Sequence, residues 1–386
     1  MKLGVSNVIL LGLISLLNDF SSEMIMPILP MFLASLGGTG LIIGFVGGVR
    51  DMLSNILKAF SGIWSDNIRK RKPFIFTGYF TSSFFKLLLG LSKTWPFVLI
   101  FSSLERVGKG IRDAPRDALI SESMPKQKGK AFGIQRAFDT TGAIFGSIVV
   151  LLLYWFLDIS FKRIIIIAAI LGFIAIIPLY LVKDIESKKR KSKSLVSCCK
   201  GLSKQFRIFL IISGIFALAN FSYMFFILKA GELFADSRLA IAIPILLYIF
   251  FNIFYASFAI PFGNLSDKIG RKKVLILGYL LFALVCLGFV FLSSIVMYFL
   301  LFIIYGLVYA MVIGNQRAFI ADLSNEEAKA TSLGIFQTTI GLLALPASII
   351  AGLLWQINTN LTFMYGALAS IIAVILFLIF GGYFKK

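Results

Sequence analysis

Long apolar segments, separated by short polar connections, run through the whole chain. They are rich in Ile, Leu and Phe and interrupted by Gly, and each is long enough to cross a bilayer as a helix that rises about 1.5 Å per residue. No segment alternates apolar and polar residues over about ten positions, as the strands of a membrane barrel do. The pattern predicts an all-α polytopic membrane protein with twelve transmembrane helices, at residues 6–34, 40–64, 73–92, 96–122, 129–157, 163–183, 207–233, 240–263, 274–294, 296–322, 329–355 and 361–384.

The placement of charge orients these helices. The 386 residues are 59% hydrophobic and 15% charged, whereas average proteins are about 25% charged, yet the net charge is +20. Of the 38 Lys and Arg residues, 24 lie at the termini and on even-numbered connections, ten lie within spans, and only four lie on odd-numbered connections: Lys93, Lys162, Arg163 and Arg238. The positive-inside rule then places both termini in the cytoplasm. We expect a multi-pass protein of the cytoplasmic membrane, whose net charge requires no nucleic-acid partner.

Several kinds of active site are not encoded. The chain has no His, and its three Cys, two of them adjacent (Cys198 and Cys199), have no zinc-ligand spacing. No nucleophile–base pair and no G-x-x-x-x-G-K-[ST] nucleotide loop occurs. The first apolar segment lacks a small-residue cleavage site and is longer than a signal peptide, so we interpret it as part of the fold. We therefore expect no enzyme activity, no metal and no other cofactor.

An internal repeat divides the chain into halves. The segments GIWSDNIRKRK (62–72) and GNLSDKIGRKK (263–273) follow the second and eighth predicted spans and align at an offset of 201 residues. The same offset pairs Arg116 with Arg317 and Lys128 with Lys329. We predict an N-terminal six-helix bundle, a cytoplasmic linker that lies on anionic headgroups and a C-terminal six-helix bundle, at residues 1–183, 184–206 and 207–386.

Two motifs carry a resemblance to a known family. Residues 263–273 match the pattern G-x-x-x-D-[RK]-x-G-[RK]-[RK] in full, whereas the first copy departs from it at Asn67 and Arg69. The stretch ERVGKGIRDAPRDALI (105–120) carries an R-x-x-x-G pattern through Arg106 and Gly110. On these motifs the whole chain resembles the major facilitator superfamily, in particular a branch of prokaryotic transporters with the opening S-E-M-I-x-P-x-L-P. The resemblance implies a monomer whose two six-helix bundles rock around a central cavity, lined by the first, fourth, seventh and tenth spans.

The repeated loop is a candidate gating motif. Its glycines would permit close approach of helices, and Asp66 and Asp267 could accept charge-assisted bonds from an Arg or from a helix N-terminus. Such bonds would hold the cytoplasmic side closed in one state and break in the other. Alternatively, the basic residues only retain the loops in the cytoplasm. The gating residues are Gly62, Asp66, Arg69, Gly263, Asp267, Gly270 and Arg271.

Charged residues within the spans form a second candidate site. Nineteen lie within predicted spans, and sixteen of these belong to the first half. Each is costly in lipid, so they must face a wet cavity or one another. Either they form fixed ion pairs, or some carry protons and contact substrate. The proton-coupling and substrate candidates are Asp19, Glu23, Arg50, Asp51, Glu105, Arg106, Lys109, Arg112, Asp113, Arg136 and Asp139.

Within this set, Asp19 and Glu23 lie four residues apart on one helix face, and two neighbouring carboxylates resist ionising together, which suits proton carriage. Arg106 falls on the family's motif arginine, which in relatives is tied to proton coupling. Arg112 is a candidate contact for a substrate anion, or a partner of Asp19. From the other half, Asn220, Asn315 and Gln316 either contact substrate or hydrogen-bond helices together.

We therefore expect a secondary active transporter that moves a small polar or charged solute by alternating access, coupled to protons. Alternatives are a multidrug or metabolite efflux antiporter, a lipid flippase, or a non-transporting sensor on a transporter scaffold. The segment GAIFGS (142–147) lacks the Gly-Pro core of the family's antiporter signature, which weakens drug/proton antiport.

Overall fold

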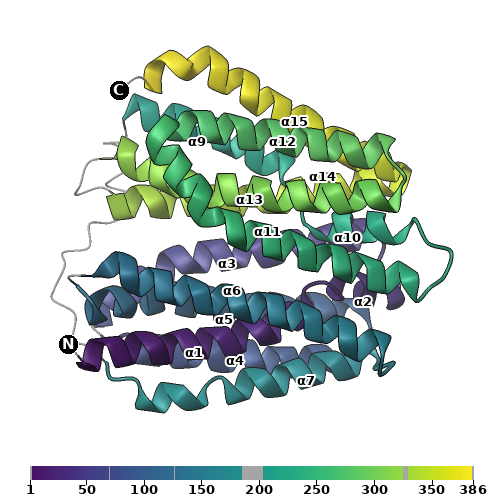
Figure 1. Ribbon diagram of the computed structural model, residues 1–386. Coiled ribbons are helices and arrows are strands. Elements are labelled where there is room, and N and C mark those ends of the chain that lie inside the picture. The colour runs from purple at the N-terminus through teal and green to yellow at the C-terminus, as the bar shows by residue number, and fades with distance from the viewer. Residues whose placement is uncertain (1, 69, 126, 185–202, 325–328, 385–386) are drawn as a thin grey trace. The chain divides into compact units, whose positions relative to one another are not determined.

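The computed structural model describes residues 2–68, 70–125, 127–184, 203–324 and 329–384 (Figure 1). Nearly all of these residues are helical, and no strand occurs among them. Arg69 and almost all of the predicted linker lie outside the described residues. The chain forms two compact units. Unit 1 comprises Met1–Gly38 and Leu53–Ser192, and unit 2 comprises Thr39–Met52 and Lys193–Lys386.

Unit 1 is a bundle in which α1 packs against α6 and α7, and α4 packs against α5 and α7 (purple to teal in Figure 1). The first predicted span is broken at a proline, because α1 ends before Pro27 and α2 begins after it. Gly142 and Gly146 face the backbone of α1 so closely that a Cβ on either would collide with a carbonyl oxygen. The helices are α1 (Lys2–Ile25), α2 (Leu29–Ser35), α3 (Gly40–Ile68), α4 (Lys72–Gly90), α5 (Trp95–Ser123), α6 (Lys128–Trp155), α7 (Phe161–Ile174) and the 3-10 helix η1 (Ile177–Leu181).

Unit 2 is built in a similar way. The helix α13 packs against α11 and α12, and α15 packs against α9 and α12 (green to yellow in Figure 1). The predicted span 207–233 is interrupted at Asn220, which follows the last residue of α9. The helices are α9 (Lys204–Ala219), α10 (Met224–Gly231), α11 (Leu239–Ile269), α12 (Arg271–Phe291), α13 (Ile295–Leu323), α14 (Lys329–Ile357), α15 (Thr359–Ile379) and the 3-10 helix η4 (Phe380–Phe384).

The first part of α3 packs with unit 2 because of its glycines. A Cβ on Gly44 would collide with the carbonyl oxygen of Ser348 in α14, and a Cβ on Gly48 would lie 2.9 Å from the Cα of Leu345. Glycine therefore allows the two helix backbones to touch here. From Leu53 onward, α3 packs with unit 1.

Ten segments of the described residues are long and apolar enough to span a membrane. The predicted spans that do not qualify are α4 and α5. The reason is clearest in α5, which carries eight charged residues. The all-α membrane fold is thus confirmed, and the count of twelve spans stays a prediction.

Candidate functional site

The helix α5 carries a stripe of charged side chains that are buried within unit 1. The charges recur three or four residues apart, so most of them share one helix face. Lipid offers no partner for such groups, so neighbouring helices must supply the partners. The buried members expose between 1% and 8% of their surface, and they are Glu105, Arg106, Arg112, Asp113 and Arg116.

Lys86 of α4 is a fully buried cation opposite this stripe. Its Nζ donates to the Oγ atoms of Ser21 and Ser22 in α1, each at 2.9 Å. Ser21 in turn donates to the carbonyl oxygen of Ala168 in α7, at 2.5 Å. These bonds join α1, α4 and α7 through one ammonium group, so Lys86 is a central member of the cluster.

Glu105 connects α4 to the motif arginine. Its Oε1 accepts a hydrogen bond from Ser82 Oγ at 3.2 Å, and its Oε2 lies 3.3 Å from Arg106 Nε. Arg106 Nη2 also lies 2.6 Å from the sulfur of Met26, at the break between α1 and α2. A movement of α2 relative to α1 would therefore change the contact between Met26 and Arg106.

Arg112 is the most deeply buried arginine of the stripe. Its guanidinium carbon lies 4.4 Å from the centroid of the Tyr79 ring, a cation–π contact from α4. Its Nε is 4.0 Å from Asp113 Oδ1, which is too long for a hydrogen bond. Among the described residues, no acceptor bonds Arg112 Nε or Nη1. The side chain thus holds donors that a ligand could use.

Asp113 and Arg116 have conventional partners. Asp113 Oδ2 lies 3.3 Å from Lys58 Nζ on α3. Arg116 Nη1 donates to Ser15 Oγ on α1 at 2.8 Å, and its Nη2 lies 3.1 Å from Asp117 Oδ1. These contacts tie α5 to α1 and α3, as expected for fixed structural pairs.

The other candidates of the first half are distributed more widely. Arg50 is buried and Asp51 is exposed, and both belong to the part of α3 that packs with unit 2. Arg136 is exposed on α6, whereas Asp139 is half-buried and accepts a 2.7 Å hydrogen bond from Gln135. The half-buried ones on α1 and α5 are Asp19, Glu23 and Lys109.

Unit 2 contributes amides and tyrosines instead of charges. Asn315 donates to the carbonyl of Met311 in its own helix, and Gln316 donates to the Tyr279 hydroxyl, each at 2.8 Å. Both side chains thus have partners within unit 2. Asn220 lies at the end of α9, outside the helix. Its Oδ1 accepts a long hydrogen bond, 3.5 Å, from the Tyr309 hydroxyl.

Tyr309 lies within an aromatic group that joins α11 and α13. Its ring centroid is 5.0 Å from that of Tyr305, 5.1 Å from that of Phe251 and 6.0 Å from that of Tyr255. Tyr305 donates to the Tyr309 hydroxyl at 3.2 Å. Tyr255 and Tyr309 are half-buried, so this group combines aromatic faces with hydroxyl groups.

The gating loop of unit 1 is organised by Arg71. This arginine lies 2.5 Å from Asp66 at the end of α3 and 3.1 Å from Glu122 at the end of α5. It also donates to Ser65 Oγ at 2.7 Å. Burial opposes the charge of Arg71, but the bonds to Glu122 and Asp66 outweigh this effect and raise its pKa above the ordinary value. The side chain therefore stays cationic and clamps the two helix ends.

Unit 2 repeats the clamp in a more exposed form. Arg271 lies 3.1 Å from Asp267 at the end of α11 and 2.5 Å from Asp322 near the end of α13. The first glycine of each motif was expected to allow two helices to approach closely. This prediction is wrong for Gly263, where an added Cβ would meet no atom within 4 Å. An added Cβ on Gly62 would make only an ordinary contact of 3.4 Å. Gly270 connects α11 to α12 with a φ of +98°. Side chains other than hydrogen disfavour this backbone conformation, so the turn favours glycine here.

Three residues of these networks were not among the predicted site residues: Lys86, Tyr79 and Arg71. A signal existed for Lys86, because Ser82, Ser83 and Lys86 place polar groups on one face of an otherwise apolar helix. For Arg71, the alignment at a constant offset drew attention to Arg69, which lies outside the described residues. Asp66 and Arg71 are five residues apart, whereas Asp267 and Arg271 are four apart, so the two arginines occupy neighbouring and not equivalent positions of the repeat.

Comparisons with known proteins identify relatives along the whole chain. A sequence profile of the Major Facilitator Superfamily matches residues 11–250 and 209–385. The chain is 57% identical over 374 residues to an uncharacterized MFS-type transporter of Methanocaldococcus jannaschii, covering 96% of this chain and 94% of the relative. It is 30% identical over 132 residues to the multidrug resistance protein MdtH of Shigella dysenteriae, covering 34% of this chain and 32% of that protein. A crystal structure of a mutant nucleoside transporter NupG has a TM-score of 0.84 at 17% identity, over 98% of this chain and 100% of that one, and it shows the shared fold alone.

Proposed function

Because the chain belongs to the Major Facilitator Superfamily, a family of secondary transporters, we propose that it moves a small polar or charged solute by alternating access, coupled to protons. The chain is a multi-pass membrane protein of this family and no enzyme. We further propose that it lies in the cytoplasmic membrane with both termini in the cytoplasm, as the distribution of Lys and Arg predicts.

The observation that carries the proposal is the state of Arg112. The Arg112 side chain is 1% exposed, and two of its nitrogens have no acceptor among the described residues. Burying such a charged group lowers the stability of the fold, so packing alone does not explain its presence. The neighbouring pairs, such as Lys58 with Asp113, already join the helices. Arg112 is therefore our candidate for the group that binds the anionic part of the solute, with Lys86 and Glu105 beside it in the same polar network.

The gating proposal rests on the two arginine clamps. Arg71 joins the ends of α3 and α5, and Arg271 joins the ends of α11 and α13. In each clamp, one arginine contacts two carboxylates that belong to different helix ends. We propose that the clamps close in one transport state and open in the other.

The aromatic group of unit 2 favours a second candidate function, the efflux of aromatic cations. Tyr255 and Tyr309 present faces on which a flat cation can stack. The partial likeness to a protein named for multidrug resistance agrees with this alternative. The two candidates differ in the charge of the solute, because Arg112 would bind an anion and the tyrosines would bind a cation.

The test begins with a thermal-shift screen of purified protein against organic anions, phosphorylated metabolites, aromatic cations and antibiotics. Flux of each hit is then measured in proteoliposomes with an imposed pH gradient. We expect an anionic hit, and Arg112→Gln should lower its flux at least about tenfold, because a hydrogen bond to a charged group contributes roughly 1.5–3 kcal/mol. The exposed Arg163→Gln should transport normally. Stabilisation only by aromatic cations would favour the second candidate, and binding without flux would favour a sensor.

A further inference from the structure

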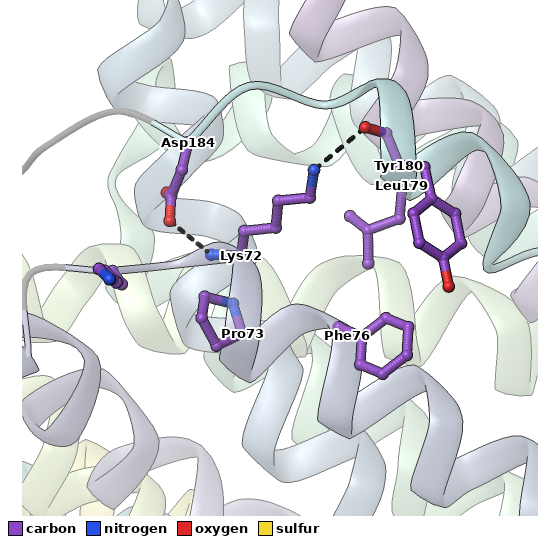
Figure 2. A pocket seen from close by; sticks show the side chains of 7 residues that line it. Lys72, Pro73, Phe76, Leu179, Tyr180 and Asp184 are labelled. Atoms are coloured by element: carbon purple, nitrogen blue, oxygen red, sulfur yellow. Dashed lines mark hydrogen bonds between the residues drawn. The ribbon is translucent and has the colours of Figure 1, made fainter.

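The start of α4 and the segment around η1 enclose a cavity of about 430 Å³ in unit 1, separate from the charge cluster (Figure 2). Two lysines, two aromatic rings, a leucine and a carboxylate line it together with Pro73. These are Lys70, Lys72, Phe76, Leu179, Tyr180 and Asp184. The cavity therefore combines a cationic rim with an apolar wall.

The cavity is held open by hydrogen bonds between its two sides. Lys72 Nζ donates to the carbonyl oxygens of Tyr180 at 3.1 Å and Val182 at 2.8 Å. The Asp184 carboxylate accepts hydrogen bonds from the backbone N–H groups of Arg71 and Lys72, each at 3.2 Å. Figure 2 shows the bond from Lys72. The segment after η1 thus caps the N-terminus of α4, and these bonds connect the two sides of the cavity.

These bonds leave a net positive site. The Asp184 carboxylate is already bound by two amides at a helix N-terminus, where negative charge is stabilised. Lys72 bonds only neutral carbonyls, and one of its three donors is left over. Lys70 is exposed and forms no ion pair with any of the described residues. Two lysines therefore supply the cavity with donors for an anion.

An apolar strip leads away from the cavity along α4. The Phe76 ring stacks on Phe80 with centroids 6.1 Å apart, and Phe80 stacks on Phe84 at 6.2 Å. Tyr180 meets Phe76 edge to face at 6.3 Å and is 72% exposed. Phe80 and Phe84 are also exposed, as side chains that contact acyl chains are.

We propose that this cavity binds the phosphate group of an anionic membrane lipid. Lys70 and Lys72 contact the phosphate, Tyr180 lies at the level of the headgroup, and an acyl chain follows Phe76, Phe80 and Phe84. The loop before α4 carries many basic residues and is predicted to face the cytoplasm, where membranes present anionic lipids. A free phosphate would use the same lysines but would leave the aromatic strip uncovered. The proposal is independent of the transported solute.

The test is native mass spectrometry of the full-length protein released from nanodiscs that contain phosphatidylcholine with a minor fraction of phosphatidylglycerol. We expect phosphatidylglycerol to be retained preferentially. Lys70→Gln should reduce its retention about fivefold, the change expected when one lysine near an anionic membrane surface is lost. Lys93→Gln, an exposed lysine just after the other end of α4, should leave retention unchanged. Tyr180→Ala should weaken retention without altering the unfolding temperature.

Two results would overturn the proposal. The first is equal retention of phosphatidylglycerol by the parent protein and by Lys70→Gln at equal thermal stability. The second is complete displacement of the lipid by excess inorganic phosphate, which would assign the lysines to a soluble anion. Lys70 is an exposed loop residue, so its substitution tests binding without disturbing the fold.

Discussion

Lys86 is a buried ammonium whose hydrogen-bond acceptors are two neutral serine hydroxyls. Within the described parts of the chain, no carboxylate lies within the 4.0 Å that defines an ion pair with it. Hydroxyls compensate a buried charge less well than a carboxylate does. We therefore expect an apolar side chain of similar length to be no worse for stability, which agrees with a role of this charge in the proposed transport.

We predict that Lys86→Met folds normally and transports poorly. Replacing a buried charge by a well-packed apolar side chain is often neutral or stabilising, so the unfolding temperature in detergent should stay the same or rise. Solute flux in proteoliposomes should fall at least about tenfold if the ammonium contributes a charged hydrogen bond of roughly 1.5 kcal/mol or more in transport. Lys162→Met, at an exposed lysine, serves as the control. Normal flux in Lys86→Met would contradict the prediction and would show that Lys86 only packs the helices together.

Single residues were predictable where a motif or a spacing marked them. Arg106 and Arg112 were singled out by the pattern on α5, and both are buried there. Lys86 and Tyr79 were missed because only the fold reveals what lies opposite the polar face of α4. The roles proposed for Asp19 and Glu23 remain predictions, because burial alone does not define a proton path.

At the scale of elements, the helices follow directly from the apolar periodicity. The predicted spans 40–64 and 296–322 correspond to α3 (Gly40–Ile68) and α13 (Ile295–Leu323). The break at Pro27 was predictable because proline removes a backbone donor. The break at Asn220 was not, because no proline or glycine marks it, and the bond from Tyr309 comes from a helix that is distant in sequence.

The loop between α3 and α4 supplies a prediction at this scale. Arg71→Gln would leave Asp66 and Glu122 without their shared cation, so the ends of α3 and α5 should separate. A reporter is Ser61→Cys, because Ser61 is buried and donates to the Gly110 carbonyl of α5 at 2.9 Å. In a background without the three native cysteines, Arg71→Gln should increase maleimide labelling of this cysteine several-fold.

The matched control is Arg271→Gln in unit 2. Arg271 is more exposed than Arg71, and exposed ion pairs contribute only about 0–1 kcal/mol. It also clamps other helices, so labelling of Ser61→Cys should change little. Equal labelling in the parent and in Arg71→Gln, with normal folding, would show that the loop is only a topological signal.

At the scale of the whole molecule, the duplication extends to details of both units. Lys72 binds carbonyls of the Tyr180 region, and Lys272 donates to the Gly381 carbonyl of η4 at 3.0 Å. Tyr180 and Gly381 are 201 residues apart, the offset of the sequence repeat, whereas Lys72 and Lys272 are 200 apart and are therefore neighbouring positions of the repeat. The repeat therefore predicted two similar units. It did not predict that residues 39–52 pack with unit 2, since glycines mark a close helix contact without naming the partner.

The proposed proton coupling belongs to the scale of the whole molecule, and an experiment can separate it from solute binding. Asp19 lies within electrostatic range of Lys86 and Asp139, so it belongs to the polar network of unit 1. If Asp19 or Glu23 carries the proton, Asp19→Asn and Glu23→Gln should abolish accumulation driven by a pH gradient. Counterflow exchange of the solute should persist in both variants, because exchange needs binding and conformational change but no net movement of protons.

Measuring both activities in the same proteoliposomes distinguishes the interpretations. Asp236→Asn, at an exposed residue of the loop after α10, is the control and should retain accumulation and exchange. Misfolding of both single variants would support fixed ion pairs, because removing one partner of a buried pair leaves an uncompensated charge. Continued accumulation in the double variant would exclude these two carboxylates. The proton would then have to be carried by one of the other acidic candidates, which are Asp51, Asp113 and Asp139.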